Sequence, residues 1–224
     1  MNYVIACAGG FGREIFHALS LSLQQQNKLA NKNDTIIGFI DDNLQSLDNY
    51  GNRYPPIIDT IETYKQKTGE VIFIASGSPQ SRQKIAGLLK EKGCLFTSIV
   101  HPEATLSKSV VIGNGSHIGW GTFISCDVTI GKFVSLNCNL TIGHDAIIDD
   151  YVEVGPGTSI SGFCHIEEGV HIATNCTITP GVRVGAWSKV SANTAVMRDV
   201  PPYSYVIGVP GTVHKDFFQH PEQQ

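Results

Sequence analysis

The sequence is poor in charge, and its few charges are not clustered. Charged residues make up 16% of the 224 residues, the formal net charge is −4, and the lysines and arginines are scattered along the chain. Proteins whose main partner is a nucleic acid gather Lys and Arg on one face to contact phosphates. That function class is therefore excluded, and a small-molecule substrate is expected.

Long hydrophobic runs and paired cysteines are also absent from the sequence. No apolar run approaches the roughly 18 residues of a membrane span, and the segment MNYVIACAGG has no basic region of the kind that begins a signal peptide. The six cysteines include no CxxC pair and no zinc-like spacing, which favours free and mostly buried thiols in a reducing compartment. We expect a cytoplasmic protein without membrane insertion and without a metal site.

Glycine is abundant, and the chain divides into two halves of different periodicity. The 23 glycines exceed the usual share of about 7% and indicate many turns. The first half alternates short apolar strands with amphipathic helices, a pattern typical of a parallel sheet covered by helices. It predicts an α/β, Rossmann-like domain over residues 1–98. The expected strands are 3–8, 35–40 and 71–76, and the expected helices are 13–26 and 79–93.

The second half follows a strict period of six residues. Each hexad carries one aliphatic residue, often followed by Gly, with small or β-branched residues recurring two positions before it. Such a repeat is typical of a parallel β-helix, in which short strands stack coil on coil around a shared core. It predicts an all-β domain with a C-terminal tail over residues 99–224. The periodic aliphatic residues are Leu106, Ile112, Ile118, Ile124, Ile130, Leu136, Ile142, Ile148, Val154, Ile160, Ile166, Ile172, Ile178, Val184, Val190 and Val196.

This repeat resembles that of the hexapeptide-repeat acyltransferases, whose left-handed β-helix takes three hexads per triangular coil. The hand is implied by the resemblance alone, because the general crossover rule favours a right-handed path. With its α/β half, the chain is similar over nearly its whole length to the bacillosamine-pathway N-acetyltransferases and the sialic acid O-acetyltransferases. The resemblance implies a sugar acetyltransferase that uses acetyl-CoA.

A glycine-rich turn, CAGGFGRE, follows the first expected strand. Its glycines, within residues 9–12, lie at the turn into a helix, where backbone N–H groups and the helix dipole favour a phosphate. The full G-x-G-x-x-G motif would need glycine in place of Cys7, so the turn alone fits a plain tight turn equally well. Asp41 and Asp42 end the next strand, where acidic residues accept hydrogen bonds from a ribose or base. Together these features favour nucleotide binding.

The resemblance implies which residues hold the nucleotide-linked sugar. In the subgroup, the glycine turn, two aspartates at a strand end and a glycine after the third strand contact this substrate. The family often has His at the position of Phe11. The matching positions here are Gly9, Gly10, Phe11, Gly12, Asp41, Asp42, Ser76 and Gly77, and Asn137 matches a position near the sugar. The nucleotide, UDP, dTDP or GDP, stays open.

One histidine of the repeat is the candidate base for acetyl transfer. Histidine suits proton removal from an amine or hydroxyl near neutral pH. His144 lies in NLTIGHDAII, which resembles the family segment with a catalytic His and an acidic neighbour. The resemblance makes His144 the general base and Asp145 its orienting carboxylate, provided that the pair lies at a coil corner. The other histidines are expected to be solvated or structural, those in the repeat exposed: His17, His101, His117, His165, His171, His214 and His220.

Acetyl-CoA is expected next to His144. At three hexads per coil, Gly162 lies one coil above His144 and leaves space beside the imidazole for a thioester. By resemblance, Gly162 offers a backbone N–H to the acetyl group or the pantetheine, and Thr174 and Ala192 contact coenzyme A. Family members of this type are trimers with coenzyme A between adjacent β-helices, which implies a homotrimer. Trp120 and Trp187 either mark that contact or are isolated surface aromatics.

Three alternatives stay open at this stage. A nucleotide-binding domain favours N-acetylation of a nucleotide-linked 4-amino-4,6-dideoxy sugar, destined for a surface polysaccharide such as an O-antigen or capsule, over O-acetylation of a sialic acid type of sugar. Direct attack of the sugar on acetyl-CoA is expected, and a ping-pong route through Cys126 or Cys138 is the alternative. A non-catalytic nucleotide-sugar-binding β-helix protein is the third possibility.

Overall fold

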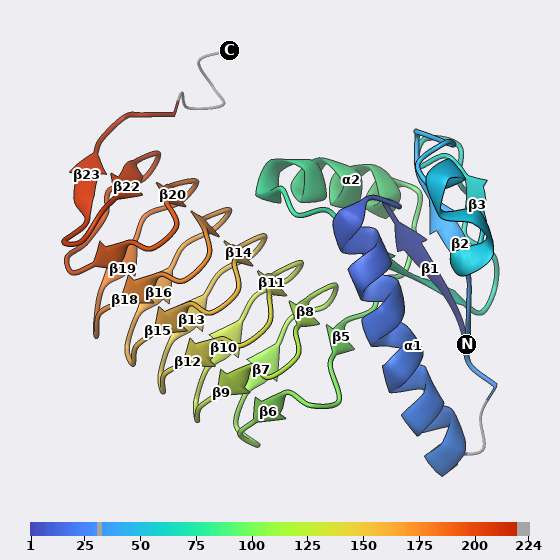
Figure 1. Ribbon diagram of the computed structural model, residues 1–224, viewed down its shortest axis with the longest axis horizontal. Helices are drawn as coiled ribbons and strands as arrows, with labels where there is room; N and C mark the ends of the chain where they lie inside the picture. Colours follow the sequence, from blue (N-terminus) through green and yellow to red (C-terminus); the bar gives the residue numbers. More distant parts are fainter. Residues whose placement is uncertain (31–32, 219–224) are drawn as a thin grey trace. The chain divides into compact units, whose positions relative to one another are not determined.

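The computed structural model describes residues 1–30 and 33–218, which divide into two compact units at Pro102 and Glu103 (Figure 1). The first unit is an α/β domain, and the second is a left-handed parallel β-helix. The predicted fold class is therefore confirmed. Within the described ranges, neither helix has the length and apolar character of a membrane span.

The α/β unit is built on a four-stranded parallel sheet with the strand order β3-β2-β1-β4. Apolar residues of its strands are buried in a hydrophobic core. Ile15, Leu19 and Leu23 of the first helix, which lie four residues apart on one face, pack into the same core. The second helix begins at the expected place, where Ser78 caps it and Pro79 follows. The elements are β1 (Asn2–Ala6), α1 (Gly10–Ala30), β2 (Thr35–Ile40), η1 (Asp48–Arg53), β3 (Ile57–Asp59), β4 (Glu70–Ile74), α2 (Pro79–Glu91) and β5 (Ile99–Val100).

The sequence analysis missed two elements of this unit. The sequence analysis assigned no element to the segment between β2 and the strand at 71–76, but this segment forms η1 and β3. Strand β3 has only three residues and follows two prolines, so its pattern is too short to read. Its pairing depends on close packing instead, because a Cβ at Gly38 would lie 2.5 Å from Ile58 Cγ2.

The β-helix has three sheets, which we number by the strands they contain. Sheet one contains β8 (His117–Ile118), β11 (Ser135–Leu136), β14 (Glu153–Val154), β17 (His171–Ile172), β20 (Lys189–Val190), β22 (Tyr205–Ile207) and β23 (Thr212–His214). Sheet two contains β6 (Thr105–Leu106), β9 (Phe123–Ile124), β12 (Thr141–Ile142), β15 (Ser159–Ile160), β18 (Thr177–Ile178) and β21 (Ala195–Val196). Sheet three contains β7 (Val111–Ile112), β10 (Thr129–Ile130), β13 (Ile147–Ile148), β16 (His165–Ile166) and β19 (Arg183–Val184).

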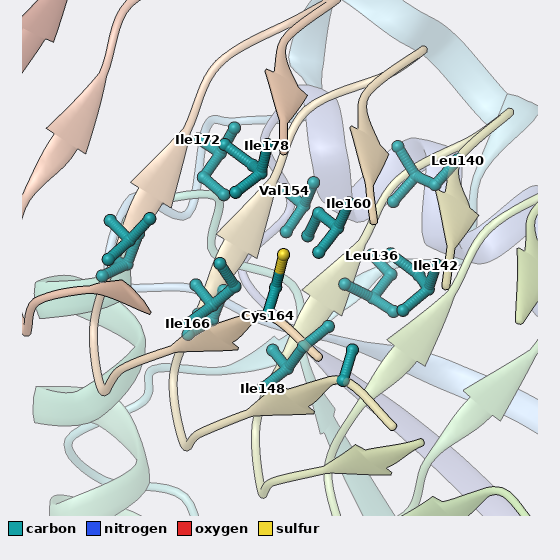
Figure 2. Packing of buried hydrophobic residues seen from close by; sticks show 14 of the residues in the cluster. Leu136, Leu140, Ile142, Ile148, Val154, Ile160, Cys164, Ile166, Ile172 and Ile178 are labelled. Carbon is teal, nitrogen blue, oxygen red and sulfur yellow. The ribbon is translucent and has the colours of Figure 1, made fainter. Parts of the chain in front are cut away.

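The periodic aliphatic residues end these short strands and point into one core. Figure 2 shows Leu136, Ile142, Ile148, Val154 and Ile160 meeting side chains of the next coil inside the β-helix. Successive coils pair in register at three hexads, as where Thr129 faces Ile147. Fully burying one such side chain contributes about 1.5 to 3 kcal/mol relative to exposing it. The repeated burial therefore explains why the hexad must be kept without insertions.

The corners between sheets explain the polar and glycine positions of the hexad. The backbone has a positive φ three residues after each of many aliphatic positions, a conformation that Gly, Asn and Asp adopt most readily. The glycine directly after the aliphatic residue has a different cause. A Cβ at Gly143 would lie 2.4 Å from the Gly162 nitrogen of the next coil, so the coils can approach only if this residue is Gly.

The C-terminal tail pairs with the final strand of each sheet. Strand β22 pairs with β20, and β23 turns back antiparallel to β22. Val200 bridges to Val184 at the end of sheet three. At the end of sheet two, the Ala195 N–H donates to the Gly208 carbonyl at 3.1 Å, and the Gly211 N–H donates to the Ala195 carbonyl at 2.8 Å. Residues 200–214 thus cap the stack of coils.

Candidate functional site

His144 and Asp145 lie at the corner between sheet two and sheet three, after β12 and before β13. Asp145 has a φ of 58°, and this turn brings its carboxylate back to its neighbour, so that His144 Nδ1 lies 2.8 Å from Asp145 Oδ2. When Asp145 is ionised, its carboxylate only accepts hydrogen bonds, and a neutral imidazole then donates from Nδ1 and leaves Nε2 as the nitrogen that can accept a proton. The side chains are 52% and 44% exposed, and solvent can reach the pair.

The next coil seats the imidazole. A Cβ at Gly162 would lie 2.9 Å from both Cε1 and Nε2 of His144 and 3.2 Å from Nδ1, so the ring packs directly against the bare backbone. The sequence analysis expected Gly162 to leave this space for a thioester, but the imidazole itself occupies it. A residue without a Cβ at position 162 is thus required for this position of the His144 ring.

Phe163 is a residue of this site that the sequence analysis missed. Its ring meets the imidazole of His144 at a right angle, with centroids 5.0 Å apart and an interplanar angle of 89°. The coil length could have revealed it, because Phe163 lies one coil above Asp145 and directly follows Gly162.

A second His–Asp pair lies in the same β-helix. His165 Nε2 is 2.8 Å from Asp149 Oδ2, with side chains 30% and 39% exposed. His165 lies within β16, flanked in register by Ile147 and Arg183, and not at a corner. Sequence analysis expected His165 to be an exposed repeat residue, but it is half-buried and paired.

The glycine turn connects β1 to α1 at the carboxyl edge of the sheet. Its shape depends on Gly12, where a Cβ would lie 2.1 Å from the Cys7 carbonyl oxygen, and on Cys7, whose φ is 79°. Burial, together with the carboxylates of Asp41 and Asp42, raises the pKa of the Cys7 thiol to about 12. This thiol therefore stays protonated at neutral pH. Gly9 and Gly10 are exposed, whereas Phe11 is half-buried against the hydrophobic core.

The two aspartates after β2 hold backbone groups of this unit. Asp41 accepts a hydrogen bond from the Ala8 N–H at 2.7 Å and another from the Asn43 N–H at 2.8 Å. Asp42 accepts one from the Ile61 N–H at 2.9 Å through Oδ1. Asp41 therefore ties the glycine turn to the neighbouring strand, a role that the sequence analysis did not assign to it.

The segment after β4 completes this edge of the sheet, because β1 lies between β2 and β4. Ser76 is half-buried, and its carbonyl accepts a hydrogen bond from the guanidinium of the buried Arg82. Gly77 is exposed, and a Cβ there would meet nothing within 4 Å. The structure thus brings the glycine turn, the aspartates and residues 76–77 to one edge, where ligands bind in open parallel sheets.

The residues of the β-helix that were expected to contact the sugar and coenzyme A lie at a different corner of the β-helix from His144. Asn137 follows β11, Thr174 follows β17 and Ala192 follows β20, all at the corner between sheet one and sheet two. Asn137 accepts a hydrogen bond from the Cys138 N–H at 2.8 Å, and Thr174 and Ala192 are exposed. Within one chain, the structure does not bring these residues to the corner of His144.

The remaining histidines and cysteines differ in burial. The expectation that His117 is exposed is wrong, since only 5% of it is accessible, and His171 is half-buried. His101 is buried, His17 packs its ring against Phe16 and Tyr54, and His220 lies outside the described residues. All six cysteines are free thiols, with Cys126 exposed and Cys138 half-buried. Among the described residues, no group of three or more His, Cys, Asp or Glu side chains is arranged to hold a metal.

Comparison with known proteins identifies relatives of both units. Residues 2–89 match the family model described as the PglD N-terminal domain. No curated protein sequence matches the chain. Among solved structures, WeeI from Acinetobacter baumannii is 27% identical, with 96% of this chain and 100% of that chain covered and a TM-score of 0.81.

Two further structures resemble the chain. The acetyltransferase domain of PglB from Neisseria gonorrhoeae is 25% identical, with 94% of this chain and 98% of that chain covered and a TM-score of 0.81, and it is also known in complex with acetyl coenzyme A. A mutant perosamine N-acetyltransferase from Caulobacter crescentus, in complex with CoA and GDP-perosamine, is 23% identical, with coverages of 96% and 98% and a TM-score of 0.80. These likenesses confirm the resemblance to hexapeptide-repeat sugar acetyltransferases and support the predicted acyltransferase class.

Proposed function

We propose that this chain is an acetyl-CoA-dependent N-acetyltransferase that acts on a nucleotide-linked 4-amino-4,6-dideoxy sugar for surface polysaccharide or glycan biosynthesis. The observation that carries the proposal is the His144–Asp145 pair, with Nδ1 2.8 Å from the carboxylate and the ring seated on Gly162. This arrangement leaves Nε2 as a base at an accessible corner. A cytoplasmic location is part of the proposal, and six free thiols fit a reducing compartment.

The pair supports direct transfer. The neutral amine of the sugar attacks the acetyl carbonyl while His144 Nε2 removes its proton, and Asp145 stabilises the imidazolium that forms. The new C–N bond replaces the C–S bond of the thioester, and the proton passes from His144 to the departing thiolate. A backbone N–H of the next coil stabilises the oxyanion in between. No side chain is acetylated on this route.

The solved relatives support the donor and the acceptor class. The PglB domain is known with acetyl coenzyme A, and the perosamine N-acetyltransferase with CoA and GDP-perosamine. In this chain, the glycine turn, Asp42 and residues 76–77 share the carboxyl edge of the parallel sheet, which suits a nucleotide-linked sugar. We propose this edge as the nucleotide-binding site, with UDP, dTDP and GDP all to be tested.

A homotrimer is the assembly we propose. The base lies at the corner between sheets two and three, whereas Asn137, Thr174 and Ala192 lie at the corner between sheets one and two. Two edges of one β-helix cannot face the same groove, but edges of two neighbouring copies can. Closed rotational symmetry would then give each groove one edge of each kind. Sedimentation equilibrium of the full chain tests this proposal, and a monomer at the concentration of the activity assay would contradict it.

The test of function is thiol release from acetyl-CoA with a panel of acceptors, namely UDP-, dTDP- and GDP-linked 4-amino-6-deoxy sugars and free sialic acid. Turnover with one nucleotide-linked amino sugar is expected, and the product should contain an amide. Turnover with a hydroxyl acceptor alone would replace the proposal by O-acetylation. No turnover with any acceptor, with tight binding of a nucleotide sugar, would leave a non-catalytic binding protein.

A further inference from the structure

Phe163 is a large apolar side chain that touches the proposed base and is exposed in the single chain. Its backbone N–H donates to the His144 carbonyl at 2.9 Å, and its ring lies at 89° to the imidazole. Nevertheless, 62% of the residue is exposed. Burial in the core of the β-helix therefore does not account for an aromatic residue at this position.

The corner geometry does not account for it either. Phe163 has a φ of 58°, a conformation that a bulky residue adopts at a cost and that Gly, Asn and Asp adopt readily. Among the described residues of the β-helix, the other aromatic residues with a positive φ are buried or half-buried, and packing against their neighbours offsets that cost. Phe133 stacks on Tyr151 with centroids 5.5 Å apart, and the indole of Trp187 covers Gly169.

Phe163 belongs to a different column of corners, one coil apart from each other. The column contains Asp127, Asp145, Phe163 and Gly181, and a Cβ at Gly181 would meet nothing within 4 Å. The ring that Phe163 contacts is the imidazole of His144, which lies in the neighbouring column, directly before Asp145. The contact that compensates for the strained corner is therefore made with the base.

We propose that Phe163 is a positioning residue for His144, an inference that rests on the proposed function. Asp145 holds Nδ1, and Gly162 lies against the ring. Phe163 adds a second ring whose plane is at right angles to the imidazole, so it restricts rotation of an imidazole that is otherwise 52% exposed. Nε2 then keeps one direction toward the acceptor, and precise orientation of a reacting group is a large part of catalysis.

The first variant is Phe163→Asn, because the chain itself places Asn at corners with positive φ, at residues 139, 175 and 193. This variant should keep the fold and remove the aromatic ring that meets the imidazole at a right angle. A positioning role predicts that kcat falls about tenfold, while KM for acetyl-CoA and for the sugar stays within about twofold. Phe163→Tyr keeps the ring and should restore kcat.

The matched control is Phe123→Asn. Phe123 is also an exposed phenylalanine of the β-helix, at 46%, but it lies within β9 and faces Thr105 and Thr141 in register. Its loss should leave kcat and KM unchanged. Thermal unfolding of both variants shows whether either effect arises from stability.

A second measurement does not depend on turnover. Relaxation of the 13C-labelled Cε1–H bond of His144 reports fast motion of the imidazole in the free protein. Mobility should increase in Phe163→Asn and stay unchanged in Phe123→Asn. Unchanged mobility in Phe163→Asn would overturn the inference, as would a rise in KM with unchanged kcat, which would make Phe163 a substrate contact. If the wild-type chain acetylates no acceptor, the proposed function fails, and the mobility alone decides whether Phe163 holds the ring.

Discussion

The His144–Asp145 and His165–Asp149 pairs of the β-helix have the same 2.8 Å separation and different surroundings. The pair of His144 and Asp145 uses Nδ1, lies at a corner and rests on a glycine, and both side chains are about half exposed. The pair of His165 and Asp149 uses Nε2 and lies on the flat face of sheet three, next to Arg183. A short His–carboxylate contact is thus common to both. What differs is whether the second ring nitrogen is presented at an open corner beside a bare backbone.

The largest expected effect separates the two histidines. His144→Ala removes the proposed base and should lower kcat by about 10²- to 10⁴-fold, the usual contribution of general base catalysis. His165→Ala should leave kcat within about twofold, because a residue outside the reacting groups contributes little to the chemical step. The measurement is thiol release at saturating acetyl-CoA, with circular dichroism of both variants. Equal losses of kcat in the two variants would contradict the assignment of the base to His144 and not to His165.

The glycine beneath the imidazole gives the next largest effect. Gly162→Ala places a methyl group 2.9 Å from Cε1 and Nε2 of His144, so the ring must move. Displacing a base by a fraction of an ångström to 1 Å should lower kcat on the order of 10- to 10²-fold. The matched control is Gly87→Ala in α2, where a Cβ meets nothing within 4 Å. Full activity of Gly162→Ala would show that the ring position is unimportant.

The carboxylates should differ less than the histidines. Asp145→Asn keeps the shape but weakens the group that orients His144 and stabilises its protonated form, and we expect kcat to fall about tenfold. Asp149→Asn makes the same change in the other pair and should leave kcat unaltered. Kinetics at one pH with both variants checks this. A larger loss for Asp149→Asn would place the active pair on sheet three.

The smallest effect concerns the two thiols of the alternative ping-pong route, Cys126 and Cys138. Cys126 lies one coil below His144 and is exposed, and its carbonyl accepts a hydrogen bond from the Asp145 N–H at 3.1 Å. Direct transfer predicts that Cys126→Ser and Cys138→Ser keep kcat within about twofold, since neither thiol has to be acetylated. Mass spectrometry after incubation with acetyl-CoA alone should find no acetylated cysteine. An acetylated Cys126 would support the ping-pong route instead.

The hexad repeat predicted the β-helix well because its pattern is local and repeated. Each predicted aliphatic residue from Ile112 to Val196 is the last residue of a short strand. The same coil length located Gly162 next to His144. The segment holding β3 was missed because a three-residue strand has no period to detect, and its place is set by packing of Ile58 on Gly38.

Burial of the outward positions could not be predicted, because it differs between sheets with the same repeat. The residue before the aliphatic one is exposed at Thr129 and Thr141 but buried at His117 and Glu153. The pairing of His165 with Asp149 could not be predicted either, because these two residues do not lie directly above one another in successive coils. The sequence identified the candidate base through its neighbours, whereas the contact with Phe163 required the stacked coils.

The capping tail also determines the length of the β-helix. The hexad repeat itself does not set the number of coils. An uncapped stack would offer three open strand edges to another chain. Residues 200–214 occupy the end of all three sheets, and the antiparallel β23 reverses the direction that a further parallel strand would need. The tail thus ends the stacking of coils. A whole coil could be added between two existing coils, and the same end piece would still close it.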